Sequence, residues 1–209
     1  FLPFQRLFPK PTSASWVSSE APGLLDYEAD GERASKRFGK EMKQLSSDTQ
    51  GLANTLAKHS ARVRDLSKPG KKVKGTDKQK RANAAAKSID RSAVYIEKRA
   101  KLFEALVKEI VRNYDGLITA VSLDTEEHKV AAPSLRDALQ SNENATLGAI
   151  TGLSGYRDSV RTVHQKNLSR TITIASKRLR DGLDSILKTL QQFQQGSRHM
   201  RANLDKKLR

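Results

Sequence analysis

Cysteine is absent from the 209-residue sequence, and aromatic residues make up only 5% of it. Without cysteine there can be no disulfide framework, no thiolate nucleophile and no metal or cluster site with cysteine ligands. Apolar residues are also few, at 36% against about 45–50% in a typical globular domain, so we expect no thick multilayer core. No run of about 18 uncharged apolar residues occurs, so no transmembrane helix is predicted within the sequence.

Positive charge is in excess: 39 Lys and Arg residues stand against 23 Asp and Glu, a formal net charge of +16. Charged residues form 30% of the chain, and with so few aromatic residues this favours long helices that bury one narrow stripe. The chain begins at Phe1 and not at Met, as expected of a processed protein or of a fragment of a longer one.

Residues 1–26 are predicted to form a non-helical arm, because prolines interrupt any helix there. The start of this arm is nonetheless apolar. Its candidate docking residues are Phe1, Leu2, Phe4, Leu7 and Phe8. We expect the arm to dock over the end of the protein's own helices, in a groove of a partner, or on a membrane surface.

Two long helices are predicted from alternating three- and four-residue spacings between apolar or small positions. The first covers about residues 28–67 and the second about 77–122. These positions are Phe38, Met42, Leu45, Thr49, Leu52, Leu56, His59, Val63 and Leu66 in the first helix, and Ile89, Ala93, Ile96, Ala100, Phe103, Val107, Ile110, Tyr114, Leu117 and Val121 in the second. Such a seam keeps one stripe of each helix against a neighbour. Further apolar residues broaden the second stripe, which favours a bundle of three or four helices.

A basic connector, residues 67–81, separates these two helices. Lys68-Pro69-Gly70 is predicted to end the first helix, since proline cannot continue it and glycine suits a left-handed cap. Thr76 and Gln79 have the spacing of a capping box, which predicts the start of the second helix there.

A third helical segment follows, with start signals at Asp124 and again at Pro133. Three glycines within residues 148–155 predict a turn or a hinge, because each glycine in a helix interior costs about 1 kcal/mol relative to alanine. The last helix is then predicted from about 156 to 195, with Gly196-Ser197 ending it before a basic tail, residues 196–209.

No alternating strand pattern competes with these helices. The predicted fold class is therefore all-α: an elongated antiparallel helical bundle of three long helices, with the third hinged near 148–155. The bundle has four helices if the hinge is a full turn. We expect a single helical-bundle domain, residues 27–209, preceded by the arm.

No constellation of residues predicts catalysis. The four histidines, His59, His128, His164 and His199, lack a second histidine or carboxylate at a metal-binding spacing. No Gly-x-Ser-x-Gly elbow and no phosphate-binding loop occurs, and the paired carboxylates lie on polar helix faces or at a helix start. We therefore expect a protein that is not an enzyme, with no metal, no cofactor and no small-molecule substrate.

The excess of basic residues predicts contact with an anionic surface, because it gathers in the connector and in the C-terminal segment. The candidate residues are Lys68, Lys71, Lys72, Lys74, Lys78, Lys80, Arg81, Lys177, Arg178, Arg180, Arg198, Arg201, Lys206 and Lys207. A solvated face that only aids solubility is the simpler explanation, but +16 exceeds the net charge of about 2–8 that solubility needs in a small domain.

Three functions are compatible with these features. The first is a non-enzymatic scaffold or interaction module on an anionic surface, for which a membrane fits best because the arm adds an apolar anchor. The second is an extracytoplasmic sensor or structural segment of a larger membrane protein. The third is nucleic-acid binding through the connector and tail, although the seam aromatics serve packing and the helices are too long for a helix-turn-helix. We also expect a homo-oligomer or a larger assembly, with a protein partner on the long helical face.

Overall fold

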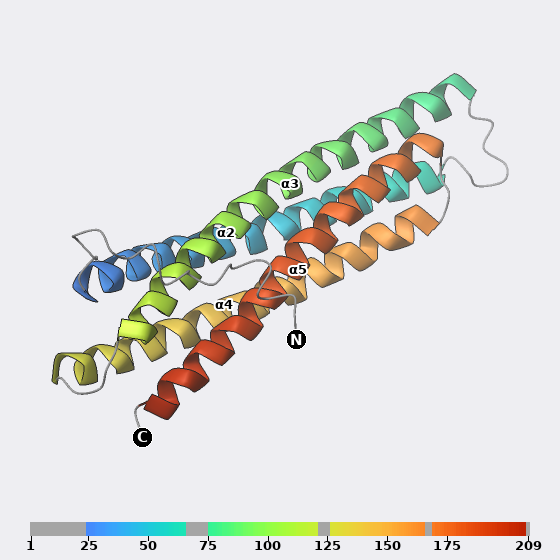
Figure 1. Cartoon of the computed structure of the whole chain (residues 1–209). Helices are drawn as coiled ribbons and strands as arrows, with labels where there is room; N and C mark the ends of the chain where they lie inside the picture. Colours follow the sequence, from blue (N-terminus) through green and yellow to red (C-terminus); the bar gives the residue numbers. More distant parts are fainter. Residues whose placement is uncertain (1–23, 66–74, 121–125, 166–168, 208–209) are drawn as a thin grey trace. The chain divides into compact units, whose positions relative to one another are not determined.

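The computed structural model of the chain describes residues 24–65, 75–120, 126–165 and 169–207. It contains four helices, α2 (Leu24–Asp65), α3 (Gly75–Ala120), α4 (Glu126–Gln165) and α5 (Arg170–Lys207), as Figure 1 shows. The described residues contain no strand, so the prediction of an all-α bundle is confirmed. None of these helices combines the length and the apolar content that crossing a bilayer would require, within the residues described. The arm predicted for residues 1–26 lies almost wholly outside the described residues.

The described residues divide into two compact units. Unit 1 contains residues 24–41, 104–120, 126–147 and 190–207, and unit 2 contains residues 42–65, 75–103, 148–165 and 169–189. Each helix thus contributes one segment to each unit, and consecutive segments within a unit alternate in direction (Figure 1). In unit 2, for example, Arg157 of α4 pairs with Asp184 of α5 at 3.5 Å, whereas His164, seven residues later, lies 3.3 Å from the carbonyl of Thr173.

The core of unit 1 is built around two aromatic rings. Phe38 of α2 and Phe193 of α5 are both fully buried, with ring centroids 4.8 Å apart in a tilted arrangement that suits the charge distribution of aromatic rings. Aliphatic side chains of α3, α4 and α5 complete the core. They are Leu106, Val107, Ile110, Val111, Leu135, Leu139, Leu190, Met200 and Leu204.

A buried polar network also links three helices of unit 1. The Tyr114 hydroxyl of α3 lies 2.5 Å from the Ser35 hydroxyl of α2, which accepts a hydrogen bond from the Asn142 side chain of α4 at 3.0 Å. Thr146 donates to the carbonyl of Asn142 at 2.6 Å. Because buried polar groups are costly without partners, this network favours one mutual arrangement of the three segments.

The core of unit 2 depends on close approach between α3 and α5. Gly182 of α5 faces Ile96 of α3, and a Cβ atom at position 182 would lie 3.3 Å from the Ile96 Cγ2 atom. Small residues on α3, among them Ala85 and Ala93, are buried beside the larger Ile89 and Ile96. Such alternation of small and large side chains lets two helices pack tightly.

Burial confirms the predicted seams wherever their side chains are described. In α2, Phe38, Met42, Leu45, Thr49 and Leu56 are buried. In α3, the buried seam positions are Ile89, Ala93, Ile96, Phe103, Val107, Ile110 and Tyr114. The remaining predicted seam positions are half-buried or lie outside the described side chains. The four–three spacing therefore identified the packing face of both helices correctly.

The turn predicted at 148–155 is wrong, because α4 continues through all three glycines to Gln165. Gly148, Gly152 and Gly155 lie on the exposed face, and nothing else comes within 4 Å of where their Cβ atoms would be. The intervening Ala149 and Leu153 are buried in the core of unit 2. Burial of these apolar side chains at helical spacing outweighs the low helix propensity of the glycines. The boundary between the two units on α4 does fall here, between Leu147 and Gly148.

Helix α4 instead ends at Gln165, and α5 begins at Arg170. Ser169 caps α5: its side-chain oxygen accepts a hydrogen bond from the backbone N–H of Ile172 at 3.2 Å. The helix end predicted at Gly196-Ser197 is also wrong, because both residues are buried inside α5, which ends at Lys207. The apolar seam simply continues past them to Met200 and Leu204.

Two further start signals were misplaced. Helix α3 begins at Gly75, so Thr76 lies within the first turn and the Gln79 side chain donates to Asn83 at 3.0 Å instead of closing a capping box. The predicted connector therefore includes residues 75–81 of α3, about two helical turns. Pro133 lies inside α4, seven residues after its start at Glu126.

Replacing Gly152 by Ala tests the continuity of α4. The added methyl group meets no neighbour and removes backbone freedom from the unfolded chain, so we expect about 0.5–1 kcal/mol of stabilisation in urea denaturation. Gly182→Ala is the matched control inside the core, where the contact with Ile96 should remove most or all of this gain. Destabilisation by Gly152→Ala would contradict a continuous helix.

Candidate interface for an anionic surface

The net positive charge of the described helices lies entirely in unit 2. The helical segments of unit 1 contain 12 Lys and Arg residues against 13 Asp and Glu, whereas those of unit 2 contain 19 against 8. Each helix contributes charged residues to both units, because each helix has one segment in unit 1 and one in unit 2. An excess of one sign raises the local concentration of counter-ions, so unit 2 has the stronger positive potential of the two described units.

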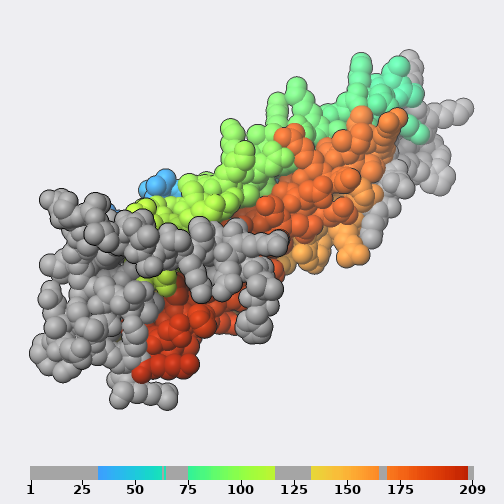
Figure 2. All heavy atoms as spheres, viewed as in Figure 1, coloured from blue at the N-terminus to red at the C-terminus, as the bar shows by residue number. Residues whose placement is uncertain are grey.

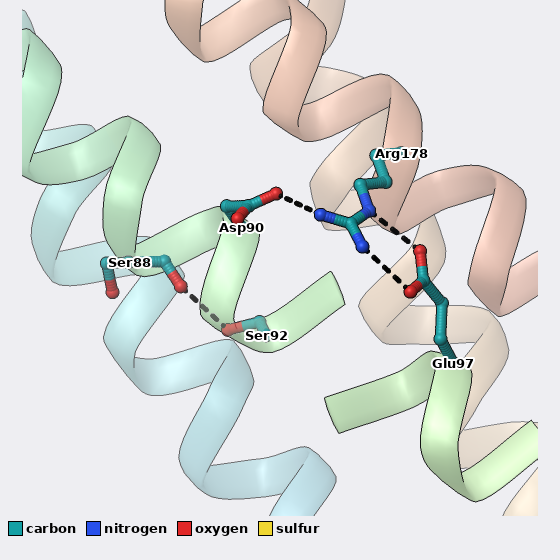
Figure 3. Close-up of polar contacts among 5 residues, drawn as sticks. All are labelled: Ser88, Asp90, Ser92, Glu97 and Arg178. Atoms are coloured by element: carbon teal, nitrogen blue, oxygen red, sulfur yellow. Dashed lines mark hydrogen bonds and ion pairs between the residues drawn. The ribbon is translucent and has the colours of Figure 1, made fainter. Parts of the chain in front are cut away.

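Arg178 of α5 engages two carboxylates of α3 at once, as Figure 3 shows. Its Nε and Nη2 atoms donate to the two oxygens of Glu97 at 2.8 and 2.9 Å, and its Nη1 atom donates to Asp90 at 2.7 Å. The planar guanidinium suits this bidentate geometry. We call this group, Arg178 with Asp90 and Glu97, the Arg178 clamp.

The Arg178 clamp favours the charged forms of Glu97 and Arg178. Hydrogen bonding by Arg178 lowers the pKa of Glu97 below its usual range, an effect that slight desolvation opposes. Glu97, followed by Asp90, raises the pKa of Arg178 in turn. Two of the acidic side chains on α3 in unit 2 are thereby compensated inside the structure.

Asp48 of α2 also contacts side chains of α3. Asp48 accepts a short hydrogen bond from the Tyr95 hydroxyl, and Arg99 lies 3.7 Å from the same carboxylate oxygen. The Arg99 Nε atom donates to Tyr95 at 2.9 Å while its guanidinium carbon lies 5.3 Å from the centre of the Tyr95 ring. Desolvation and the Asp48 hydrogen bond raise the pKa of Tyr95, so it remains protonated.

Six of the eight acidic side chains in the helical segments of unit 2 pair with four of its ten arginines. Besides the contacts above, Arg157 lies 3.5 Å from both Asp158 and Asp184, and Arg180 lies 3.8 Å from Asp181. The lysines of its helical segments, in contrast, form no ion pair with any residue that the structure describes. A lysine ammonium is a strongly hydrated point charge on a flexible stem, so these lysines leave unit 2 with a surplus of uncompensated cations.

The predicted site residues fall into four groups, of which the C-terminal tail is the last. Those outside the described residues are Lys68, Lys71, Lys72 and Lys74 of the connector, and Phe1, Leu2, Phe4, Leu7 and Phe8 of the arm. Those in unit 2 that are exposed and without a described partner are Lys78, Lys80, Arg81 and Lys177. Arg178 and Arg180 of unit 2 are instead engaged by the carboxylates named above.

The predicted residues of the C-terminal tail belong to unit 1. Arg198 donates to Glu143 of α4 at 2.6 Å, and Arg201 lies 3.2 Å from the other oxygen of this carboxylate. Only 9% of the Glu143 side chain is exposed, so both arginines neutralise a buried charge. Lys206 is exposed, and Lys207 is the last residue of α5. The described part of the tail therefore belongs to unit 1, whose helical segments as a whole carry no excess of positive charge.

Sequence analysis missed the exposed cations on α3 beyond the connector. Lys87, Arg91, Lys98 and Lys101 are all exposed and none has a described ion-pair partner. Their spacing of four, seven and three residues is a helical repeat opposite the apolar seam, and this pattern would have identified them. They were overlooked because they do not form a contiguous run.

The described residues also include histidine and tyrosine side chains outside these ion pairs. No group of three or more His, Asp or Glu side chains there could hold a metal ion. His59 is half-buried, and desolvation together with Arg62 and Lys58 lowers its pKa, which favours the neutral ring. Tyr156 of α4 is buried in unit 2, where burial raises its pKa to about 12, an effect that nearby Ser92 opposes in part.

Comparison with protein-family models, with curated proteins and with solved structures finds no match for this chain.

Glu143 provides a test of the tail's structural role. Replacing both Arg198 and Arg201 by Gln leaves a buried carboxylate without a cation, so we expect a loss of about 2 kcal/mol in the free energy of unfolding. Adding Glu143→Gln to this variant should restore most of the loss in urea denaturation. A tail whose arginines were free would show neither the loss nor the recovery.

The raised pKa of Tyr156 predicts that unit 2 loses stability at alkaline pH. An unfolded tyrosine ionises near pH 10, whereas Tyr156 ionises in the folded state at about 12. Its contribution is therefore complete below pH 10 and is lost as the pH rises from 10 to 12, with about 1 kcal/mol gone by pH 11. Urea denaturation between pH 8 and 11.5 should show this loss in the wild type and not in Tyr156→Phe; equal pH dependence in both would refute it.

Proposed function

We propose that this chain is a non-enzymatic helical interaction module that associates with an anionic membrane surface through unit 2. The observation that supports this proposal is the segregation of charge, with 19 basic against 8 acidic residues in the helical segments of unit 2 and near neutrality in unit 1. Paired arginines hold the helices together while unpaired lysines remain exposed.

The magnitude of this attraction is sufficient for peripheral binding. Each Lys or Arg near an anionic leaflet contributes roughly 1 kcal/mol, and the contributions fall off within a Debye length of about 8 Å at physiological ionic strength. Several cations acting together therefore give micromolar or tighter association without any inserted helix. The apolar residues Phe1, Leu2 and Phe4 of the sequence would strengthen it as a second anchor.

The exposed cations favour a membrane over nucleic acid. Specific recognition of bases and phosphates relies on the planar fork of arginine, which contacts two acceptors at once. In unit 2 four arginines, Arg99, Arg157, Arg178 and Arg180, are engaged internally. Among the exposed cations of unit 2 without a described ion-pair partner, lysines outnumber arginines by nine to six. Point charges of this kind suit a layer of lipid headgroups whose positions adjust to the protein.

Sedimentation with vesicles tests the proposal. We expect the protein to pellet with vesicles of phosphatidylserine and phosphatidylcholine in 50 mM salt, to be released by 500 mM salt, and to stay in the supernatant with phosphatidylcholine alone. Failure to pellet with anionic vesicles at low salt overturns the membrane proposal. Tighter binding to duplex DNA or single-stranded RNA in parallel gel-shift measurements would favour nucleic acid instead.

A further inference from the structure

A row of cations follows the outer face of α3 in unit 2. Its members are Lys80, Lys87, Arg91, Lys98 and Lys101, and we call them the α3 row. Their spacings of seven, four, seven and three residues place them on one side of the helix. All five are exposed and none forms an ion pair with a described residue.

The α3 row lies opposite the packing face of the helix. The side chains of α3 that are buried in unit 2, including Ala85, Ile89 and Ile96, are offset from the row by about half a turn. Long side chains of α3, coloured teal and green, accordingly project away from the neighbouring helices in Figure 2. With a rise of about 1.5 Å per residue, the 22 residues from Lys80 to Lys101 extend for about 30 Å.

The Arg178 clamp engages the two acidic side chains that lie beside this row, of which Glu97 also attracts Lys101. Asp90 and Glu97 lie on the flank of α3 beside the row, and both carboxylates point toward Arg178 on α5 (Figure 3). No other acidic residue occurs on α3 between Lys80 and Lys101. The clamp thus compensates the two charges that would otherwise reduce the attraction of the row for anions.

We propose that the α3 row is the face by which unit 2 lies on an anionic lipid bilayer, with α3 parallel to the membrane plane. This inference rests on the function proposed above and adds to it the contact surface and the role of Arg178 as a positioning residue. A straight row about 30 Å long meets headgroup charges along its whole length on a plane. The backbones of a nucleic-acid duplex wind away from a straight line, so only part of the row would meet phosphates at once.

Matched lysine variants in the full chain test the contact surface. Lys87→Gln, Lys98→Gln and Lys101→Gln together remove three charges from the row, and Lys43→Gln, Lys58→Gln and Lys188→Gln remove three from other exposed positions of unit 2. We expect the row variant to bind phosphatidylserine vesicles at least tenfold more weakly than the wild type, and the control variant less than threefold.

The outcomes separate this inference from the proposed function. Equal losses in the two triple variants, with a wild type that binds, overturn the α3 row alone and leave unit 2 as a diffuse cationic surface. A wild type that binds no anionic vesicle overturns the proposed function and this inference together. Binding of the row to duplex DNA in preference to vesicles overturns the choice of lipid. Helix content by circular dichroism and the Tm of each variant, which exposed Lys→Gln changes should preserve, confirm that folding is intact.

The clamp is tested by comparing two variants that lose one charge each from α5. Arg178→Gln releases Asp90 and Glu97 beside the row, whereas Lys188→Gln releases no carboxylate. We expect Arg178→Gln to weaken vesicle binding by at least threefold more than Lys188→Gln. Adding Asp90→Asn and Glu97→Gln to Arg178→Gln should restore binding to the wild-type level or above. Equal effects of the two single variants, or no recovery in the triple variant, would refute the positioning role.

Discussion

Burial of one apolar stripe along each of four helices of about 40 residues is the constraint on which both units depend. With only 36% apolar residues, the chain can cover little more than one face of each helix, so the remaining faces are left to polar and charged side chains. Phe38 and Phe193 in unit 1, and the contact of Gly182 with Ile96 in unit 2, show how closely these stripes pack. The charged faces therefore follow from the packing of the apolar ones.

Pairing between arginines and carboxylates, together with lysines that have no described partner, determines the net charge of these faces. Arg178 and Arg157 each reach two carboxylates, and in unit 1 Glu143 is shared by Arg198 and Arg201. Pairing of this kind removes acidic charge from the surface at the points where helices meet. The lysines of unit 2 have no such partners among the described residues, so the positive charge that the composition reveals is carried there.

Much of the fold, and less of the site, could be predicted from the sequence. The seam from Ile89 to Tyr114 was correct because burial at helical spacing dominates the choice of packing face. The turn predicted at Gly148–Gly155 was wrong because local propensity yields to the burial of Ala149 and Leu153 between the glycines. Residues that meet only through folding, such as Glu97 and Arg178, leave no local signal in the sequence. The pairing of Arg178 and Arg198 with carboxylates therefore could not be predicted.

Segregated charge also means that the two units respond differently to dissolved ions. Like charges repel one another within unit 2, whose helical segments carry a basic surplus, whereas opposite charges nearly balance in the helical segments of unit 1. Dilute buffer therefore loosens unit 2 first, and added electrolyte tightens it while leaving unit 1 almost unchanged. A polyanion bound to unit 2 would reduce this repulsion as added salt does. Amide hydrogens of unit 2 would then exchange more slowly as more of the polyanion binds.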